Sequence, residues 1–326
     1  MTVDAPGGPT QGTNNTVPSV GPAAGPAAQV AAHVAAEHVP LRTCDAVRLS
    51  AVLLRSSDAG EDAGEDAGEG AAADAAAIGV VLLPGFSGWS GKPGVSRVAR
   101  WLAASTPTSA SGAATPTEVL VVDLRGHGAS AGLSTLGDRE VFDVDAAVGE
   151  MRRRGYRTVV TVGWSMGASC ALRHAALVGQ QVHHRPLQHP VDAVVAVSSA
   201  GWWYYRDTTP MRRLHWLVQT RPGRAVARRM LGVRIDSTGW AQVPLDPSEA
   251  AARITVPLLV VHGDRDAYLP LEHARAVAGA AGEAAELWEV PDFGHAEEGA
   301  DADLVARIGA ALPALVAGEL TRSASA

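Results

Sequence analysis

The sequence predicts an α/β protein with a mostly parallel sheet and helices on both faces of that sheet. Two observations carry this prediction. Short apolar runs alternate with helical patterns through most of the chain, and several of these runs are apolar throughout, as strands buried on both faces should be. The 326 residues, 47% of them hydrophobic, can bury one large core. We therefore expect one large domain without a long internal repeat.

The expected strands are runs rich in Val, Leu and Ile that end at polar or glycine-containing loops. These runs cover 46–54, 78–83, 119–123, 158–163, 191–197, 257–262 and 285–290. Apolar residues at helical spacing predict helices around 98–102, 141–151 and 304–315. In an open sheet of this kind, active-site residues are expected on the loops at the carboxyl ends of the strands.

The ends of the chain and three internal stretches set the expected domain organisation. Residues 1–36 predict a disordered leader, because they have little apolar periodicity to offset the entropy of ordering. The folded domain is expected over 37–320, followed by a flexible tail at 321–326. Biased composition at 57–76 and 105–117 predicts surface loops. Residues 201–252 interrupt the strand pattern and predict a small helical lid.

Composition excludes several classes of partner and cofactor. The net charge of -7 gives no electrostatic reason to expect nucleic acid binding. No apolar run reaches about 18 residues, so no stable membrane insertion is expected, and the absence of a secretion signal favours a cytoplasmic protein. Cys44 and Cys170 are too few for a disulfide framework and are spaced unlike a zinc motif, so no metal site is expected. The sequence does not predict the oligomeric state.

The pattern Gly-x-Ser-x-Gly, which can expose a serine nucleophile on a tight turn, occurs twice. In Gly163-Trp-Ser165-Met-Gly167 the serine directly follows the strand expected at 158–163 and precedes a helix-competent run. This strand, turn and helix context is the one that a nucleophilic serine requires. In Gly128-Ala-Ser130-Ala-Gly132 no helix follows, so Ser130 predicts an ordinary loop residue.

A serine nucleophile needs a base to take its proton and a carboxylate to orient that base. Asp264 and Asp266 follow the strand expected at 257–262, and His295 follows the last expected strand. All three lie on loops at carboxyl ends of strands, where the serine also lies. From the residues alone either aspartate can be the acid.

Ser165, an aspartate and His295, in this order along the chain, resemble the α/β-hydrolase superfamily, in particular its serine esterases and serine aminopeptidase-like hydrolases. The resemblance extends from about residue 39 to residue 320. Gly263-Asp-Arg-Asp266 is similar to the family's Gly-x-x-Asp, which implies that Asp266 is the triad acid. The fold implied is the α/β-hydrolase fold, a mostly parallel sheet of about eight strands with a small helical lid.

Leu83-Pro84-Gly85-Phe86 resembles the family's oxyanion loop. The resemblance implies that the backbone N–H groups of Phe86 and Met166 bind the oxyanion. Pro84-Gly85 stands where many members have His-Gly, which changes the side chain that braces this loop. The segment from Asp123 to Ser130 is similar to the loop after strand four in many members.

Three tryptophans are candidate substrate-binding residues. Trp202 and Trp203 open the lid segment directly after a strand, and Trp164 precedes Ser165. Aromatic rings placed there would form the wall of an acyl pocket. The alternative is a cap whose apolar face rests on the body while its arginines face water.

The function implied by the resemblance is that of a serine hydrolase. We expect a carboxylesterase that cleaves small to medium acyl esters through a Ser-His-Asp triad and an acyl-enzyme, without a metal or organic cofactor. The same triad also serves acyltransferases, thioesterases, C–C hydrolases and aminopeptidases, so these remain open. A noncatalytic ligand-binding or scaffold protein on the same fold is the alternative from another class.

Overall fold

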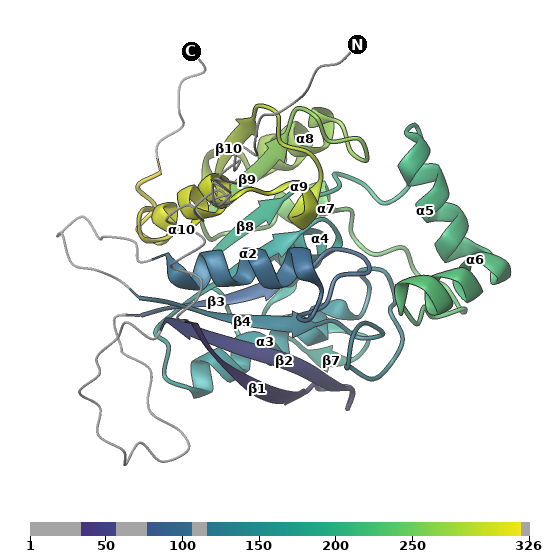
Figure 1. The fold of residues 1–326 in the computed structure, drawn as a ribbon, viewed down its shortest axis with the longest axis horizontal. Helices are drawn as coiled ribbons and strands as arrows, with labels where there is room; N and C mark the ends of the chain where they lie inside the picture. The colour runs from purple at the N-terminus through teal and green to yellow at the C-terminus, as the bar shows by residue number, and fades with distance from the viewer. Residues whose placement is uncertain (1–33, 57–76, 106–115, 321–326) are drawn as a thin grey trace, which may run out of the picture.

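An eight-stranded sheet forms the centre of the structure (Figure 1). The computed structural model describes residues 34–56, 77–105 and 116–320. The strand order is β1-β2-β4-β3-β5-β8-β9-β10; β1 and β2 run antiparallel to their neighbours, and the other strands are parallel. The strands are β1 Val34–Arg42, β2 Arg48–Ser56, β3 Ile78–Leu83, β4 Thr117–Asp123, β5 Thr158–Trp164, β8 Ala193–Val197, β9 Leu258–Gly263 and β10 Ala285–Val290.

The predicted fold class is confirmed, and each predicted strand is present within a few residues. β1 was not among the expected strands, and it begins at Val34, three residues before the boundary expected at residue 37. β1 is an edge strand with most of its side chains at least partly exposed, and it therefore lacks the apolar run of a central strand. The rest of the expected leader, the loops at 57–76 and 106–115 and the tail at 321–326 lie outside the described residues.

Helices cover both faces of the sheet and bury its two apolar surfaces. One core cluster joins the sheet to α3, α4, α7 and α8, and the other joins the opposite face to α2 and α10. The helices are α2 Pro93–Ala104, α3 Glu140–Arg153, α4 Met166–Leu177, α7 Pro247–Ala251, α8 Leu271–Ala281, α9 Ala296–Gly299 and α10 Ala302–Val316, with a short 3-10 helix η3 at Gly282–Ala284. No helix in the described part of the chain is long and apolar enough to span a membrane.

The expected lid lies between β8 and β9 and contains three helical segments besides α7. These are α5 Thr209–Gln219, α6 Arg221–Val226 and the π-helical segment η2 Ala227–Leu231. Figure 1 shows α5 and α6 set off to one side of the sheet and its covering helices. Met211 is the one buried residue of α5, so this part of the lid packs less closely than the helices on the sheet.

A small hairpin of β6 Gln181–Val182 and β7 Arg185–Pro186 follows α4.

Candidate active site

Ser165 stands on a strained turn between β5 and α4. Its φ of 51° and ψ of -113° lie outside the regions that a residue with a side chain prefers. The turn is this tight because the flanking glycines let the backbone segments approach; a Cβ on Gly167 would collide with the Leu83 carbonyl group. The local sequence thus places the Ser165 side chain at the carboxyl edge of the sheet.

His295 and Asp266 reach Ser165 from the loops after β10 and β9. Ser165 Oγ lies 2.9 Å from His295 Nε2, and His295 Nδ1 lies 2.6 Å from Asp266 Oδ2. The structure therefore brings the three sequence-predicted residues into one chain of hydrogen bonds. The Asp266 side chain is fully buried, whereas 16% of the His295 side chain is exposed, which leaves the serine end of the chain open to a ligand.

The two aspartates that the residues alone left open lie in different surroundings. Asp266 Oδ1 accepts the backbone N–H groups of Tyr268 and Leu269, at 2.8 and 2.9 Å, and its Oδ2 faces His295. Asp264 is exposed, and its Oδ1 accepts the Asp292 N–H at 2.7 Å. The geometry thus joins Asp266, and not Asp264, to the histidine.

Ser130 of the second Gly-x-Ser-x-Gly pattern has a structural setting. Its buried Oγ donates to the Asp123 carbonyl and accepts the Ser50 N–H at 2.8 Å. These bonds tie the loop after β4 to β2. His127 of the same loop bonds the Arg125 carbonyl through Nδ1 at 3.0 Å, and burial lowers the pKa of its imidazole.

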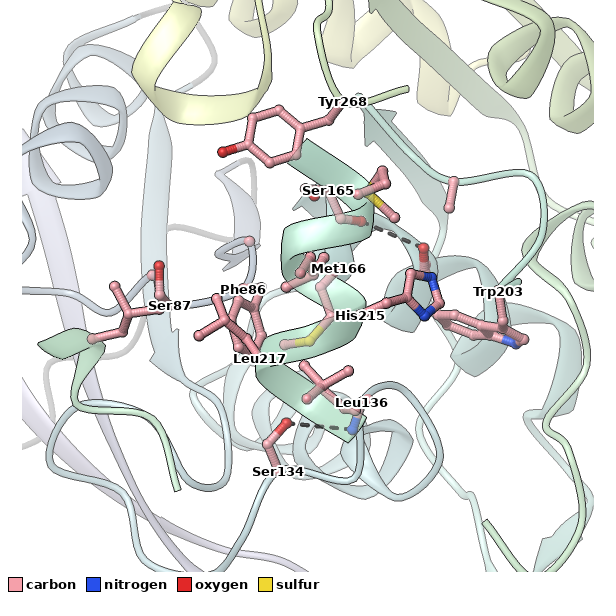
Figure 2. Close-up of a pocket in the computed structure, with 18 of the residues that line it drawn as sticks. Phe86, Ser87, Ser134, Leu136, Ser165, Met166, Trp203, His215, Leu217 and Tyr268 are labelled. Atoms are coloured by element: carbon pink, nitrogen blue, oxygen red, sulfur yellow. Dashed lines mark hydrogen bonds between the residues drawn. The ribbon is translucent and has the colours of Figure 1, made fainter. Parts of the chain in front are cut away.

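A cavity of about 800 Å³ opens beside Ser165, between the sheet edge and the lid (Figure 2). Phe86, Met166, Trp202 and Trp203 lie on its wall. Trp164 does not: its side chain is 1% exposed and packs in the core beneath the turn, which corrects its assignment as a substrate-binding residue. The residue before Ser165 still belongs to the buried strand β5, and its ring points into the core.

The lid supplies most of the apolar wall that faces Ser165. Leu214, Leu217 and Val218 of α5 line the cavity, and so do Arg213 and Arg224. The alternative was a cap whose apolar face rests on the body of the protein. It does not describe α5, because the apolar side chains of α5 line the cavity. The same alternative has the lid arginines facing water. Arg212, Arg221, Arg228 and Arg229 are exposed and lie outside the cavity.

Tyr268 and Glu297 are two of the cavity residues that were not expected from the sequence. The Tyr268 ring stacks on His295 with centroids 4.5 Å apart, and it faces the cavity from the loop that also carries Asp266. Glu297, two residues after His295, is buried beside Gly85, and burial raises the pKa of its carboxyl group. A tyrosine or glutamate on a loop carries no pattern of its own, so no signal in the sequence distinguished them.

A sequence model of the Alpha/beta hydrolase family matches residues 80–308. The chain belongs to this family. The match contains Ser165, Asp266 and His295, as well as the lid. The search among curated proteins found no significant match.

Solved structures with the same fold include several esterases. The Pyrococcus furiosus esterase Pf2001 is 20% identical, with a TM-score of 0.56 over 86% of this chain and 93% of that chain. The esterase RhEst1 from Rhodococcus sp. ECU1013 is 14% identical, with a TM-score of 0.52 over 85% and 99%. DcsB, in complex with its substrate analogue, is 14% identical, with a TM-score of 0.57 over 88% and 99%. At identities this low, the likeness to these structures shows a shared fold only.

Proposed function

We propose that this α/β hydrolase is a serine hydrolase, and specifically a carboxylesterase that cleaves small to medium acyl esters through an acyl-enzyme. One observation carries the proposal: Ser165, His295 and Asp266 form a hydrogen-bonded chain whose serine end faces a cavity. The apolar side chains of α5 suit an acyl chain, and the volume of about 800 Å³ suits a ligand of modest size.

In the proposed reaction, Ser165 Oγ attacks the ester carbonyl carbon while its proton passes to His295 Nε2. His295 Nδ1–H remains a donor to Asp266, which stabilises the imidazolium. The tetrahedral intermediate collapses as His295 gives the proton to the leaving alkoxide, and the acyl group stays on Ser165. Water then attacks the acyl carbon while its proton passes to His295. The second tetrahedral intermediate collapses as the bond to Ser165 Oγ breaks and His295 returns the proton to Oγ, which releases the carboxylic acid.

The oxyanion of the intermediate is assigned to the N–H groups of Phe86 and Met166. Met166 is the first residue of α4, where a backbone N–H has no helical acceptor and the helix dipole favours negative charge. In the described part of the chain, neither N–H donates to another protein group, so both are available to a ligand. Loss of one such donor typically costs about 10²–10³ in turnover.

Ester hydrolysis by two serine variants tests the proposal. Purified protein is assayed with p-nitrophenyl esters from acetate to decanoate, and Ser165→Ala is expected to lose about 10⁴-fold or more in kcat/KM while keeping its thermal midpoint. Ser130→Ala is the matched control, because it removes the other motif serine; it should lower stability and leave the chemistry in place. Ester hydrolysis retained by Ser165→Ala would refute the proposed function.

The same assay separates hydrolysis from acyl transfer. With an alcohol acceptor added, a hydrolase releases mainly the free acid, whereas an acyltransferase forms mainly the new ester. We expect mainly the acid. The cytoplasmic location expected from the sequence remains a prediction that fractionation of the source cells would test.

A further inference from the structure

Glu297 holds a buried carboxyl group directly beside the nucleophile turn. Its Oε1 accepts the backbone N–H of Gly85 at 2.8 Å, although the two residues are 212 positions apart in the chain. The residue as a whole is 6% exposed. Burial of a carboxyl group costs free energy unless the group makes hydrogen bonds. The bond to Gly85 is such a contact, and it joins the loop of His295 to the loop of Phe86.

The Gly85 peptide lies in a narrow space between Glu297 and Ser165. A Cβ on Gly85 would lie 3.2 Å from Ser165 Cβ and 3.3 Å from Glu297 Oε2. The next peptide carries the Phe86 N–H, so a rotation of the Gly85 backbone would redirect that N–H. Pro84, the residue before, has neither an N–H nor a polar side chain with which to brace the loop. Within the loop, the Gly88 N–H donates to the Gly85 carbonyl at 2.8 Å, and the Gly85 N–H is held from another segment, by Glu297.

The Glu297 backbone is itself held in place, so its carboxyl group can act as a brace. Arg97 Nη2 of α2 donates to the Glu297 carbonyl at 3.4 Å, and the preceding Ala296 N–H donates to Ser198 Oγ at 3.1 Å. The histidine loop is thus attached to α2, to the end of β8 and, through the carboxyl group, to the oxyanion loop. One short segment fixes both the base and the loop that carries an oxyanion donor.

We propose that Glu297 is a positioning residue, whose carboxyl group holds the Gly85 peptide so that the Phe86 N–H points at the oxyanion of the proposed esterase reaction. This inference rests on the proposed function. Glu297 acts as a hydrogen-bond acceptor, and its charge has no role. A carboxylate this close to a developing oxyanion would oppose it, so the acceptor oxygen is the useful part of the side chain.

Three substitutions separate the acceptor from the charge and from the length of the side chain. Glu297→Gln keeps an acceptor oxygen without the charge and should keep kcat/KM within about threefold of the wild type. Glu297→Ala removes the acceptor and should lower kcat/KM about tenfold or more, mainly through kcat. Glu297→Asp withdraws the carboxyl group by one methylene and should resemble the alanine variant; it replaces that variant if alanine prevents folding.

A pair of inhibitors distinguishes positioning of the oxyanion donor from general damage. With 1,1,1-trifluorooctan-2-one, Ser165 Oγ bonds to the ketone carbon, its proton passes to His295, and the ketone oxygen becomes an oxyanion. Octan-2-ol enters the same cavity and forms no such bond. Glu297→Ala should weaken the ketone about tenfold and leave the inhibition constant of the alcohol within about twofold.

Asp145→Asn is the control for loss of a buried carboxyl group. Asp145 on α3 also accepts two backbone N–H groups, those of Gln188 and His189, and does not line the cavity. Its variant should lower the thermal midpoint and keep the wild-type ratio of the two inhibition constants. An equal change for both inhibitors in Glu297→Ala, or wild-type affinity for the ketone, would overturn the positioning role. Failure of the wild-type protein to bind the ketone at all would instead overturn the proposed function.

Discussion

The floor and the roof of the cavity are built in different ways. The floor consists of the loops after β3, β5, β9 and β10, and its polar groups are held by specific hydrogen bonds, such as those of Asp266 to two backbone N–H groups and to His295. The roof consists of residues 202–205 and α5 to η2, where Met211 is the single buried residue of α5. A floor fixed by directional bonds suits chemistry, whereas a roof of loosely packed apolar side chains suits selection among acyl groups.

This contrast implies that substitutions in the floor change the rate of reaction with every ester, and that substitutions in the roof change the ranking of esters. In the proposed reaction the triad would contact the reacting bond, which all substrates share, while α5 would contact the part of the acyl group that differs between them.

The largest effect is expected from Asp266→Asn. The asparagine oxygen would take over the N–H groups of Tyr268 and Leu269, so its NH₂ group would face His295 Nδ1. This forces the imidazole proton onto Nε2, which can then no longer accept the Ser165 proton. We expect kcat to fall about 10⁴-fold for all esters. Asp264→Asn, which changes the exposed neighbouring aspartate, should stay within about threefold, and equal losses in the two variants would remove Asp266 from the triad.

A smaller and selective effect is expected from the roof. Truncation of Trp202 or Trp203 to alanine removes apolar contact area worth about 1.5–3 kcal/mol for a chain that reaches it. Longer esters should lose about 10- to 100-fold in kcat/KM, and acetate should change little. Steady-state kinetics over a series of acyl lengths measures the change in ranking.

Trp216→Ala is the matched control for this series. Trp216 lies on α5 but is 47% exposed and does not line the cavity. It should keep the wild-type ranking of esters. If the Trp202 and Trp203 variants fold and also keep that ranking, the roof does not select the acyl group.

The smallest effect concerns His273, which lies in α8 beneath the start of the roof. The ring centroids of Trp202 and His273 are 4.2 Å apart. Burial lowers the pKa of His273 from 6.5 to about 4. Between these values the unfolded chain binds a proton that the folded chain does not, so stability must fall as the pH falls from about 6.5 to 4. We expect a loss of about 1–3 kcal/mol from this residue.

Urea unfolding at pH 7 and at pH 4.5 measures the His273 contribution as a difference between variants. His273→Asn should lose less stability than the wild type on acidification, because it has no imidazole to protonate. His184→Asn, in an exposed turn, is the control and should lose as much as the wild type. Identical acid sensitivity of all three proteins would mean that His273 is not protected from protonation.

The floor could be predicted from sequence because its residues follow strands directly. Ser165, Asp266 and His295 each come within a few residues of a buried apolar run, so the order of strands predicts that their loops meet. The hydrogen bond from Gly85 to Glu297 could not be predicted, because it joins two loops that only the complete fold brings together. Trp164 was assigned wrongly because a place in the chain next to Ser165 does not fix the direction of a side chain.

The sequence predicted where the roof lies in the chain, but not which way its apolar side chains face. A small helical lid was expected over 201–252, and a helix is present there as α5, yet a helical segment alone does not say what its apolar side chains face. The edge strand β1 was missed for a related reason. Its stability comes from pairing along its whole length with β2, a contact that its own exposed and partly charged residues do not encode.

The most direct test of the central claim is covalent labelling of Ser165, the proposed nucleophile. A fluorophosphonate probe phosphonylates an activated serine, with loss of fluoride, and intact mass spectrometry counts the adducts while peptide mapping locates them. The account predicts one adduct per wild-type chain, on the peptide that contains Ser165, and no adduct on folded Ser165→Ala. An adduct on another serine, labelling that survives in Ser165→Ala, or a folded wild-type protein that takes up no probe would contradict it.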